Sequence, residues 1–106
     1  MSTKHYLFSY GSLQDSEVQL ALYNRLLIGQ KDSLQGYRIA SVKIASLYPI
    51  IYKTDTLTDL VKGIVFEITE KELLQSDDYE GEFYERVLLQ LTSKQKAWCY
   101  ISPNKI

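Results

Sequence analysis

The first segment that could do chemistry is the turn formed by Tyr10, Gly11, Ser12 and Leu13. A short aromatic run precedes this turn, and a segment with helical spacing follows it. At such a strand-to-helix turn, successive backbone N–H groups can converge on an anion, and the helix dipole adds to the attraction. The turn therefore suits a carboxylate or a developing oxyanion, although a plain connecting turn has the same features. It matches neither the GxGxxG nor the GxxxxGK phosphate-binding pattern.

The second segment is acidic and runs from residue 77 to residue 86, DDYEGEFYER. Its carboxylates lie near the C-terminal end of a predicted helix, where negative charge opposes the helix dipole. A single carboxyl group beside a glycine turn and an aromatic cluster could serve as a general acid and base. Burial would have to raise its pKa from about 4.3 to about 6–7 for that purpose. A solvated acidic face and a cation site are the alternatives, but the EF-hand spacing of carboxylates is absent.

The remaining nucleophiles have few potential partners. Ser12 could join a Ser–His–Asp triad only through His5, the one histidine, which lies in the predicted opening strand. Cys99, the one cysteine, lies between two aromatic residues of a predicted strand, which favours a buried and inert thiol. One cysteine and one histidine exclude a disulfide framework and a four-thiolate zinc site. The single histidine removes most other metal-site patterns as well, and we predict no metal-ligating residues.

The composition is that of an ordinary globular protein. Of the 106 residues, 45% are hydrophobic and 24% are charged, which fits one domain over residues 1–106. The net charge of −1 lacks the basic excess of nucleic-acid-binding proteins and gives no attraction to an anionic membrane surface. No apolar run approaches the roughly 20 residues that cross a bilayer, and no signal peptide is evident. We expect a cytoplasmic protein, either a monomer or a weak homodimer.

Alternating apolar residues and turn signals predict the strands. The expected strands cover residues 5–10, 40–45, 48–52, 60–68, 83–91 and 97–101. Gly63 marks either a bulge or a close approach of another chain segment within the fourth of them. Residues 53–59 are polar and are predicted to form a hairpin loop.

Two helices are predicted from capping-box spacings, in which Ser or Thr precedes Gln or Glu by three residues. Two pairs have this spacing: Ser16 with Gln19, and Thr69 with Glu72. The cap of the first helix can be either Asp15 or Ser16. The first helix should end near Leu27, before Gly29, and the second near Asp78. Helices and strands do not alternate regularly, which disfavours a doubly wound parallel sheet. We therefore predict an α+β fold, a mixed, barrel-like β-sheet of about six strands with two flanking helices.

Three segments together resemble the small γ-glutamylcyclotransferase-like proteins, the AIG2-like group. They are FSYGSL at 8–13, VKGIVFEI at 61–68 and SDDYEGEFYERVLLQL at 76–91, followed by the aromatic strand WCYI. Members of that family show a strand ending in Tyr-Gly-Thr/Ser-Leu, then a Gly-containing strand. Leu-Asp-x-aromatic-Glu-Gly and Tyr-x-Arg follow. The order and spacing match here, with Ser76 in place of the leucine and Gln14-Asp15-Ser16 in place of a basic stretch.

This resemblance implies an enzyme without a cofactor and a small-molecule γ-glutamyl substrate. The turn from Tyr10 to Leu13 would bind the α-carboxylate of the γ-glutamyl group through backbone N–H groups. Glu80 would be the catalytic acid and base while the substrate's α-amine attacks its own γ-carbonyl. The products would be 5-oxoproline and a free amine or amino acid. Tyr84 and Tyr100 would complete the substrate-binding pocket, and Arg86 would pair with a nearby carboxylate.

The chemistry of this reaction agrees with the implied roles. The attacking and leaving atoms are both nitrogen, so one carboxyl group within reach of both can move the proton without a metal. The nucleophile is tethered to its target, and well-oriented intramolecular attack reaches effective molarities on the order of 10⁵ M or more. The alternative is a non-catalytic module that holds a small carboxylate or a protein partner in the same pocket.

Overall fold

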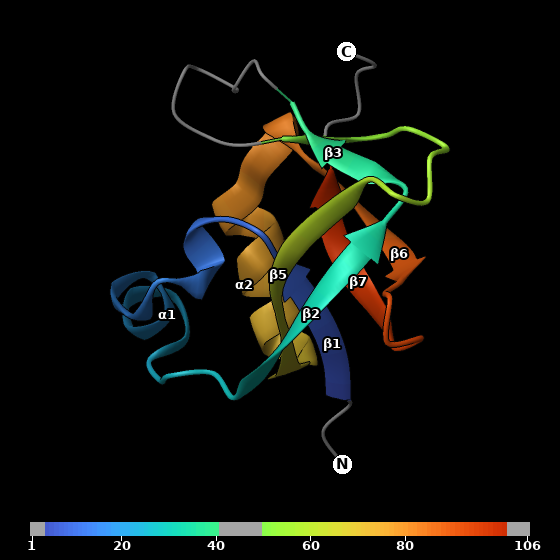
Figure 1. Ribbon diagram of the computed structural model, residues 1–106. Coiled ribbons are helices and arrows are strands. Elements are labelled where there is room, and N and C mark those ends of the chain that lie inside the picture. Colours follow the sequence, from blue (N-terminus) through green and yellow to red (C-terminus); the bar gives the residue numbers. More distant parts are fainter. Residues whose placement is uncertain (1–3, 41–49, 102–106) are drawn as a thin grey trace.

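The elements of the fold follow one another as Figure 1 shows. The computed structural model describes residues 4–40 and 50–101, except for the side chain of Phe83. In chain order the elements are β1 (Lys4–Ser9), the 3-10 helix η1 (Ser12–Gln14), α1 (Ser16–Tyr23), β2 (Gly29–Gln35), β3 (Tyr37–Ile39), β4 (Ile51–Lys53), β5 (Leu60–Thr69), α2 (Glu70–Glu80), the 3-10 helix η2 (Gly81–Phe83), β6 (Glu85–Gln90) and β7 (Lys96–Ile101). No helix among these residues is long and apolar enough to cross a bilayer.

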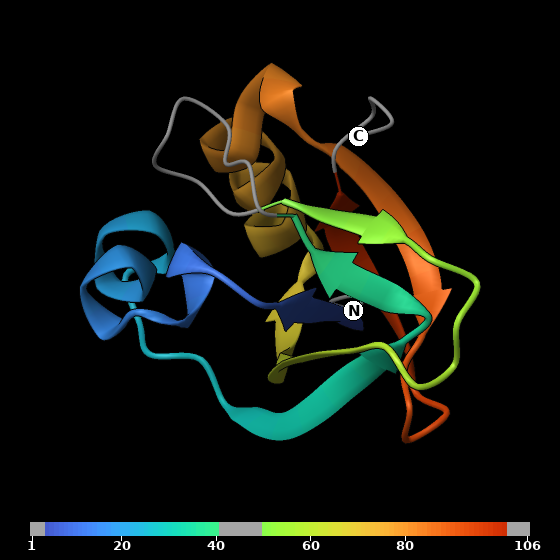
Figure 2. The same cartoon turned by 45° about the horizontal axis from the view of Figure 1, so that its top comes forward.

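Five strands form one sheet in the order β2-β5-β1-β7-β6, and β3 pairs with β4 in a separate two-stranded sheet. Strand β1 pairs antiparallel with β5 and parallel with β7, so the larger sheet is mixed. The sheet curls strongly, and β3 and β4 lie across its open side (Figure 2). The predicted α+β fold, with a barrel-like mixed sheet and two helices, is confirmed. The described residues contain seven strands where about six were expected.

Polar bonds close the barrel at one end. The turn between β6 and β7 meets β2, although β2 and β6 are the two edges of the sheet. The Ser93 hydroxyl donates to Asp32 Oδ2 over 2.5 Å, and the Thr92 N–H donates to the Ser33 carbonyl oxygen over 2.8 Å. These bonds satisfy edge groups that a flat sheet would leave to solvent.

The apolar core lies on both sides of β1, because successive strand residues point to opposite faces. Leu7 and Phe8 are therefore both buried, in different clusters. The cluster inside the barrel contains Phe8, Leu34, Ile51, Val61, Val65, Leu91, Ala97 and Cys99. The cluster between the sheet and the helices contains Leu7, Leu13, Tyr23, Phe66, Ile68, Leu73 and Tyr100. The second cluster joins η1 and α2 to the end of β1.

Gly63 in β5 marks a close approach and not a bulge. The pairing of β5 with β2 continues past this residue without an extra position, and the pairing of β5 with β1 ends next to it, at Ile64. A Cβ atom at residue 63 would lie 2.3 Å from the Ser9 carbonyl oxygen and 2.7 Å from the Phe8 ring. Only a glycine lets β5 pass this close to the end of β1, where the Tyr-Gly-Ser-Leu turn begins.

Helix α2 begins at the predicted capping box. The Thr69 hydroxyl oxygen accepts from the Glu72 N–H over 3.2 Å, and Glu72 Oε1 accepts from the Thr69 N–H over 2.9 Å. The helix extends to Glu80, slightly beyond the predicted end at Asp78. It ends where Gly81 adopts a φ of 69°, a value that favours glycine.

The capping box predicted for α1 is wrong. Asp15 occupies the N-cap position, and no side chain caps the helix. Gln19 is buried instead, where its amide donates to the Leu13 carbonyl oxygen and accepts from the Leu27 N–H. The amide thus satisfies backbone groups of the segments before and after the helix, and it is not available to Ser16. Buried backbone groups need such partners, and this need outweighs the local capping pattern.

The end predicted for α1 is also wrong. The helix stops at Tyr23, because Asn24 adopts a left-handed conformation with a φ of 58°. Asparagine tolerates this conformation better than most residues. The chain therefore turns away four residues before the predicted end near Leu27. After this turn the chain continues to β2, which begins at Gly29.

Two predictions about strands and loops need correction. Strand β2 was not expected, because residues 29–35 are mostly polar and only Leu34 among them is buried. Residues 53–59 do not form a hairpin loop, because β4 pairs with β3 whereas β5 pairs with β1 and β2. The expected strand at 40–45 and the beginning of that at 48–52 lie mostly outside the described residues.

The ion pair between α1 and α2 leads to a testable prediction about acid stability. Arg25 Nε and Nη2 donate to the buried Glu72 carboxylate over 2.6 and 2.7 Å, and this pairing lowers the pKa of Glu72. The pair stabilises the fold above the unfolded pKa of about 4.3, and its contribution is lost as pH falls through the lower, folded pKa. Glu72→Gln should therefore cost about 1.5 kcal/mol at pH 7 and little near pH 2.

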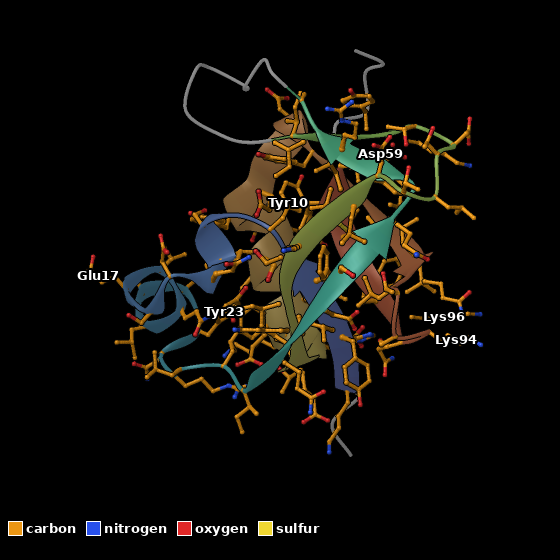
Figure 3. All side chains as sticks on the ribbon, in the orientation of Figure 1. Tyr10, Glu17, Tyr23, Asp59, Lys94 and Lys96 are labelled. Atoms are coloured by element: carbon orange, nitrogen blue, oxygen red, sulfur yellow. The ribbon has the colours of Figure 1, made fainter. Side chains whose placement is uncertain are left out.

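Urea unfolding across pH measures this effect. Glu17→Gln is the matched control, because Glu17 is exposed at the outer side of α1 (Figure 3). If Glu72→Gln lowered the free energy of unfolding by the same amount at pH 7 and at pH 2, the charge of Glu72 would not be what stabilises the fold.

Candidate active site

A small pocket opens where the end of β1 and the η1 turn face the C-terminal end of α2. Its lining residues are Phe8, Ser9, Tyr10, Gly11, Ser12, Leu13, Glu80, Tyr84 and Tyr100. The structure thus brings all seven residues predicted for catalysis and substrate binding around one cavity. They come from four separate parts of the chain. The cavity volume is about 30 Å³, close to the share of one molecule in liquid water, so it encloses only a small polar group.

Glu80 supplies the one carboxylate of this lining. It is the last residue of α2 and is only partly exposed. Burial raises its pKa to about 7. Within residues 4–40 and 50–101, no cation or hydroxyl bonds to its carboxylate, so nothing offsets the desolvation. The group can therefore both accept and release a proton near neutral pH.

Tyrosine hydroxyls connect the pocket wall to the helix behind it. Tyr10 lies in the interior of the fold (Figure 3), and its hydroxyl donates to the Tyr100 carbonyl oxygen over 2.6 Å. The Tyr100 hydroxyl donates to Asp77 Oδ1 over 2.7 Å. Burial raises the pKa of both phenols, so both stay protonated and act as donors. The same Asp77 oxygen lies 2.8 Å from Arg86 Nε in an ion pair, which confirms that Arg86 pairs with a carboxylate.

The Tyr-Gly-Ser-Leu turn is held by bonds on both sides. Ser9 anchors it at the start, where its hydroxyl oxygen accepts from the Gly11 N–H and its carbonyl accepts from the Gln14 amide. The Ser12 hydroxyl bonds to the Tyr79 hydroxyl over 2.8 Å, which ties the turn to α2. Ser12 and Leu13 open the 3-10 helix η1, and the first N–H groups of a helix have no acceptor within it. These N–H groups are suited to an anion.

Other arrangements considered for these residues do not form. Ser12 bonds to Tyr79, whereas the nitrogens of His5 lie 3.4 Å from Trp98 Nε1 and from Glu70 Oε1, so no Ser–His–Asp triad exists. Cys99 is buried, and burial raises the pKa of its thiol to about 12, which makes the thiol unreactive. The described residues contain no group of three His, Cys, Asp or Glu side chains that could hold a metal ion.

Comparison with known proteins places this site in a family. A family model described as gamma-glutamyl cyclotransferase, AIG2-like, matches residues 7–106. The chain belongs to this AIG2-like family. AIG2-like protein D of Arabidopsis thaliana is 35% identical over 99 residues, which cover 89% of this chain and 63% of that protein. AIG2-like protein C of the same plant is 33% identical over 105 residues, 93% of this chain and 59% of that protein. The chain thus spans less than two thirds of these curated relatives.

Solved structures share the AIG2-like fold. A solution structure of an Arabidopsis thaliana protein has a TM-score of 0.83 and 30% identity, and covers 97% of this chain and 71% of that one. A structure described as gamma-glutamyl cyclotransferase has a TM-score of 0.76 and 15% identity, and covers 96% of this chain and 68% of that one. At 15% identity, the similarity to the second structure shows a shared fold and nothing more.

Sequence reasoning about this AIG2-like chain missed four residues that build the site. Ser9 and Phe8 line the pocket, Tyr79 holds the turn, and Asp77 holds Tyr100 and Arg86. Tyr79 and Asp77 lie within the DDYEG segment that carries the family resemblance, so the motif contained a signal for them. Tyr79 bonds to Ser12, 67 positions away, and Asp77 bonds to Tyr100, 23 positions away, and no local pattern gives those partners.

Proposed function

We propose that this AIG2-like protein is a γ-glutamyl cyclotransferase that converts a γ-glutamyl amine or γ-glutamyl amino acid to 5-oxoproline. The observation that carries this proposal is the position of Glu80. Its partly buried carboxyl group, with a pKa near 7, faces a turn with anion-binding N–H groups across a small cavity. Family membership supports the same class of activity.

The η1 turn would hold the substrate's α-carboxylate. The backbone N–H groups of Ser12 and Leu13 would donate to it, and the Ser12–Tyr79 bond keeps them at a set distance from α2. A cavity of about 30 Å³ suits this end of the substrate, because the carboxylate and the adjacent α-carbon are small. Fixing the α-carbon places the α-amine and the γ-carbonyl within one folded γ-glutamyl unit, which favours ring closure.

Glu80 would carry the proton between the two nitrogen atoms. As a carboxylate it accepts a proton from the substrate's α-ammonium group, and the freed amine attacks the γ-carbonyl carbon. A new C–N bond then closes the five-membered ring while the carbonyl oxygen takes up negative charge. Glu80 returns the proton to the leaving nitrogen, the original amide C–N bond breaks, and the carbonyl reforms. The ring nitrogen gives up a second proton, so that it keeps one N–H in 5-oxoproline, and the released amine takes this proton up and departs as an ammonium ion. No oxidant, reductant or cofactor takes part, and Glu80 ends in its starting state.

The direct test is product formation by the purified protein. We would incubate it with a panel of γ-glutamyl amino acids and γ-glutamyl amines and measure 5-oxoproline by mass spectrometry. Time-dependent 5-oxoproline above the enzyme-free control supports the proposal. A folded protein that releases none, but whose melting temperature rises with these compounds, would instead be a binding module of the same pocket.

The pKa of Glu80 leads to a prediction about pH. Burial favours the neutral acid, so the Glu80 carboxyl should titrate with a midpoint near pH 7 in a ¹³C NMR experiment. Because the reaction needs the carboxylate first, kcat/KM should rise about ten-fold per pH unit below this midpoint and level off above it. A midpoint for Glu80 near the ordinary glutamate value of about 4.3 would remove the basis of the proposed acid–base role.

A further inference from the structure

A second cavity adjoins the first. Its volume is about 460 Å³, and it is lined by Asp77, Gly81, Tyr84, Arg86, Trp98 and Tyr100. Tyr84 and Tyr100 line both cavities, and Gly81 directly follows Glu80 in the chain. Glu80 lines the first cavity, and the residue after it lines the second. The first cavity is far too small for a whole γ-glutamyl compound, so the rest of the substrate must extend beyond it.

Arg86 is held rigidly in this second cavity. Its Nε lies 2.8 Å from Asp77 Oδ1 in an ion pair, and its Cζ lies 4.3 Å from the centroid of the Trp98 ring. Stacking and ion pairing together fix the plane of the guanidinium group before any ligand arrives. A guanidinium has five N–H donors, and the Asp77 bond uses the one on Nε. Among the described residues, no side chain or carbonyl accepts from the Nη atoms of Arg86.

We propose that the second cavity receives the leaving group of the γ-glutamyl substrate and that Arg86 binds a carboxylate on it. The preferred substrates are then γ-glutamyl amino acids and not γ-glutamyl amines that lack a carboxylate. This inference rests on the proposed cyclotransferase function. The leaving nitrogen must lie near Glu80 to receive its proton, so the atoms attached to that nitrogen continue into the adjoining cavity.

The charges of the cavity favour an anionic leaving group over a cationic one. Asp77 Oδ1 already accepts from the Tyr100 hydroxyl and forms an ion pair with Arg86, so this oxygen is occupied. A leaving group with an ammonium group would meet the guanidinium of Arg86 at close range and be repelled. A carboxylate can instead accept two parallel N–H bonds from a guanidinium, the strongest common arrangement for such a pair.

Two substrates that differ only in this carboxylate test the inference. γ-Glutamyl-alanine and γ-glutamyl-ethylamine are identical except for the carboxylate on the leaving group. We expect wild-type kcat/KM to be at least about ten-fold higher for γ-glutamyl-alanine, the gain typical of one charge-assisted bond. Arg86→Gln should bring the ratio of the two values close to one, and Arg86→Lys should give an intermediate ratio.

The ratio separates recognition from a structural effect. If Arg86 only supports Asp77 and Tyr100, its replacement lowers kcat/KM for both substrates equally and leaves the ratio unchanged, which overturns the inference. Arg38→Gln is the matched control, because Arg38 is exposed on β3 and lines neither cavity. A wild-type ratio of one also overturns the inference while the cyclotransferase function stands. Failure of wild type to release 5-oxoproline from either substrate overturns the proposed function itself.

Discussion

Glu80→Gln is expected to lower the rate of 5-oxoproline release by about 10³-fold, within the range of general acid–base catalysis. Glutamine has the same shape and fills the same place at the end of α2, but it cannot take a proton from the substrate's amine near neutral pH. The turn that would hold the α-carboxylate is unchanged, so substrate or product should still bind. The measurement is kcat for the best substrate of the panel, together with binding of 5-oxoproline to the variant.

Glu82→Gln is the matched control for this loss. Glu82 belongs to the same acidic segment, but it is exposed and does not line the pocket. Its replacement should leave kcat within about two-fold of wild type, as is usual for surface substitutions. If Glu80→Gln kept most of the activity, another group would have to carry the proton, and the enzyme would stand without Glu80 as its base. If both variants lost activity, the acidic segment would act through its total charge.

Gly63→Ala is expected to destabilise the fold by about 3 kcal/mol, the upper part of the range for overpacking a core. The added methyl group would lie 2.3 Å from the Ser9 carbonyl oxygen, a backbone atom that cannot turn aside. Either β1 or β5 must move, and the movement displaces the end of β1 that leads into the Tyr-Gly-Ser-Leu turn. Urea unfolding at pH 7 gives the loss of stability directly.

Lys62→Ala is the control for Gly63→Ala. Lys62 precedes Gly63 in β5 and is exposed, so the change removes a side chain from the same strand without adding one to the core. We expect its free energy of unfolding to differ from wild type by about 0.5 kcal/mol or less. Equal stability of Gly63→Ala and Lys62→Ala would mean that the two strands can separate without cost, contrary to their close approach.

Much of the fold was predictable because its signals are local. The strands β1, β5 and β7 alternate or concentrate apolar residues over short runs, and the Thr69–Glu72 box marks the start of α2. The motifs also indicated seven of the nine residues that line the pocket. Their chemical roles stay predictions until the protein is assayed.

The failures occurred where partners distant in sequence decide the local structure. Gln19 has the spacing of a capping residue, but tertiary contacts give its amide two backbone partners outside α1. Strand β2 is polar, and its position depends on pairing with β5 and on bonds from Asp32 and Ser33 to the β6–β7 turn. The partners of Gln19 and of β2 cannot be predicted from the residues of either segment alone.

The sequence by itself determined the α+β class, the family resemblance and the residue types of the site. Apolar periodicity, capping boxes and short motifs involve only residues that are close together in the sequence. Only the tertiary structure decided that Glu80 is partly buried with no compensating cation among the described residues, and that Asp77 is shared by Tyr100 and Arg86. The physical reason is that burial and electrostatic pairing depend on what surrounds a group in space. In this chain those surroundings come from β1, α2, β6 and β7, which are joined only by folding.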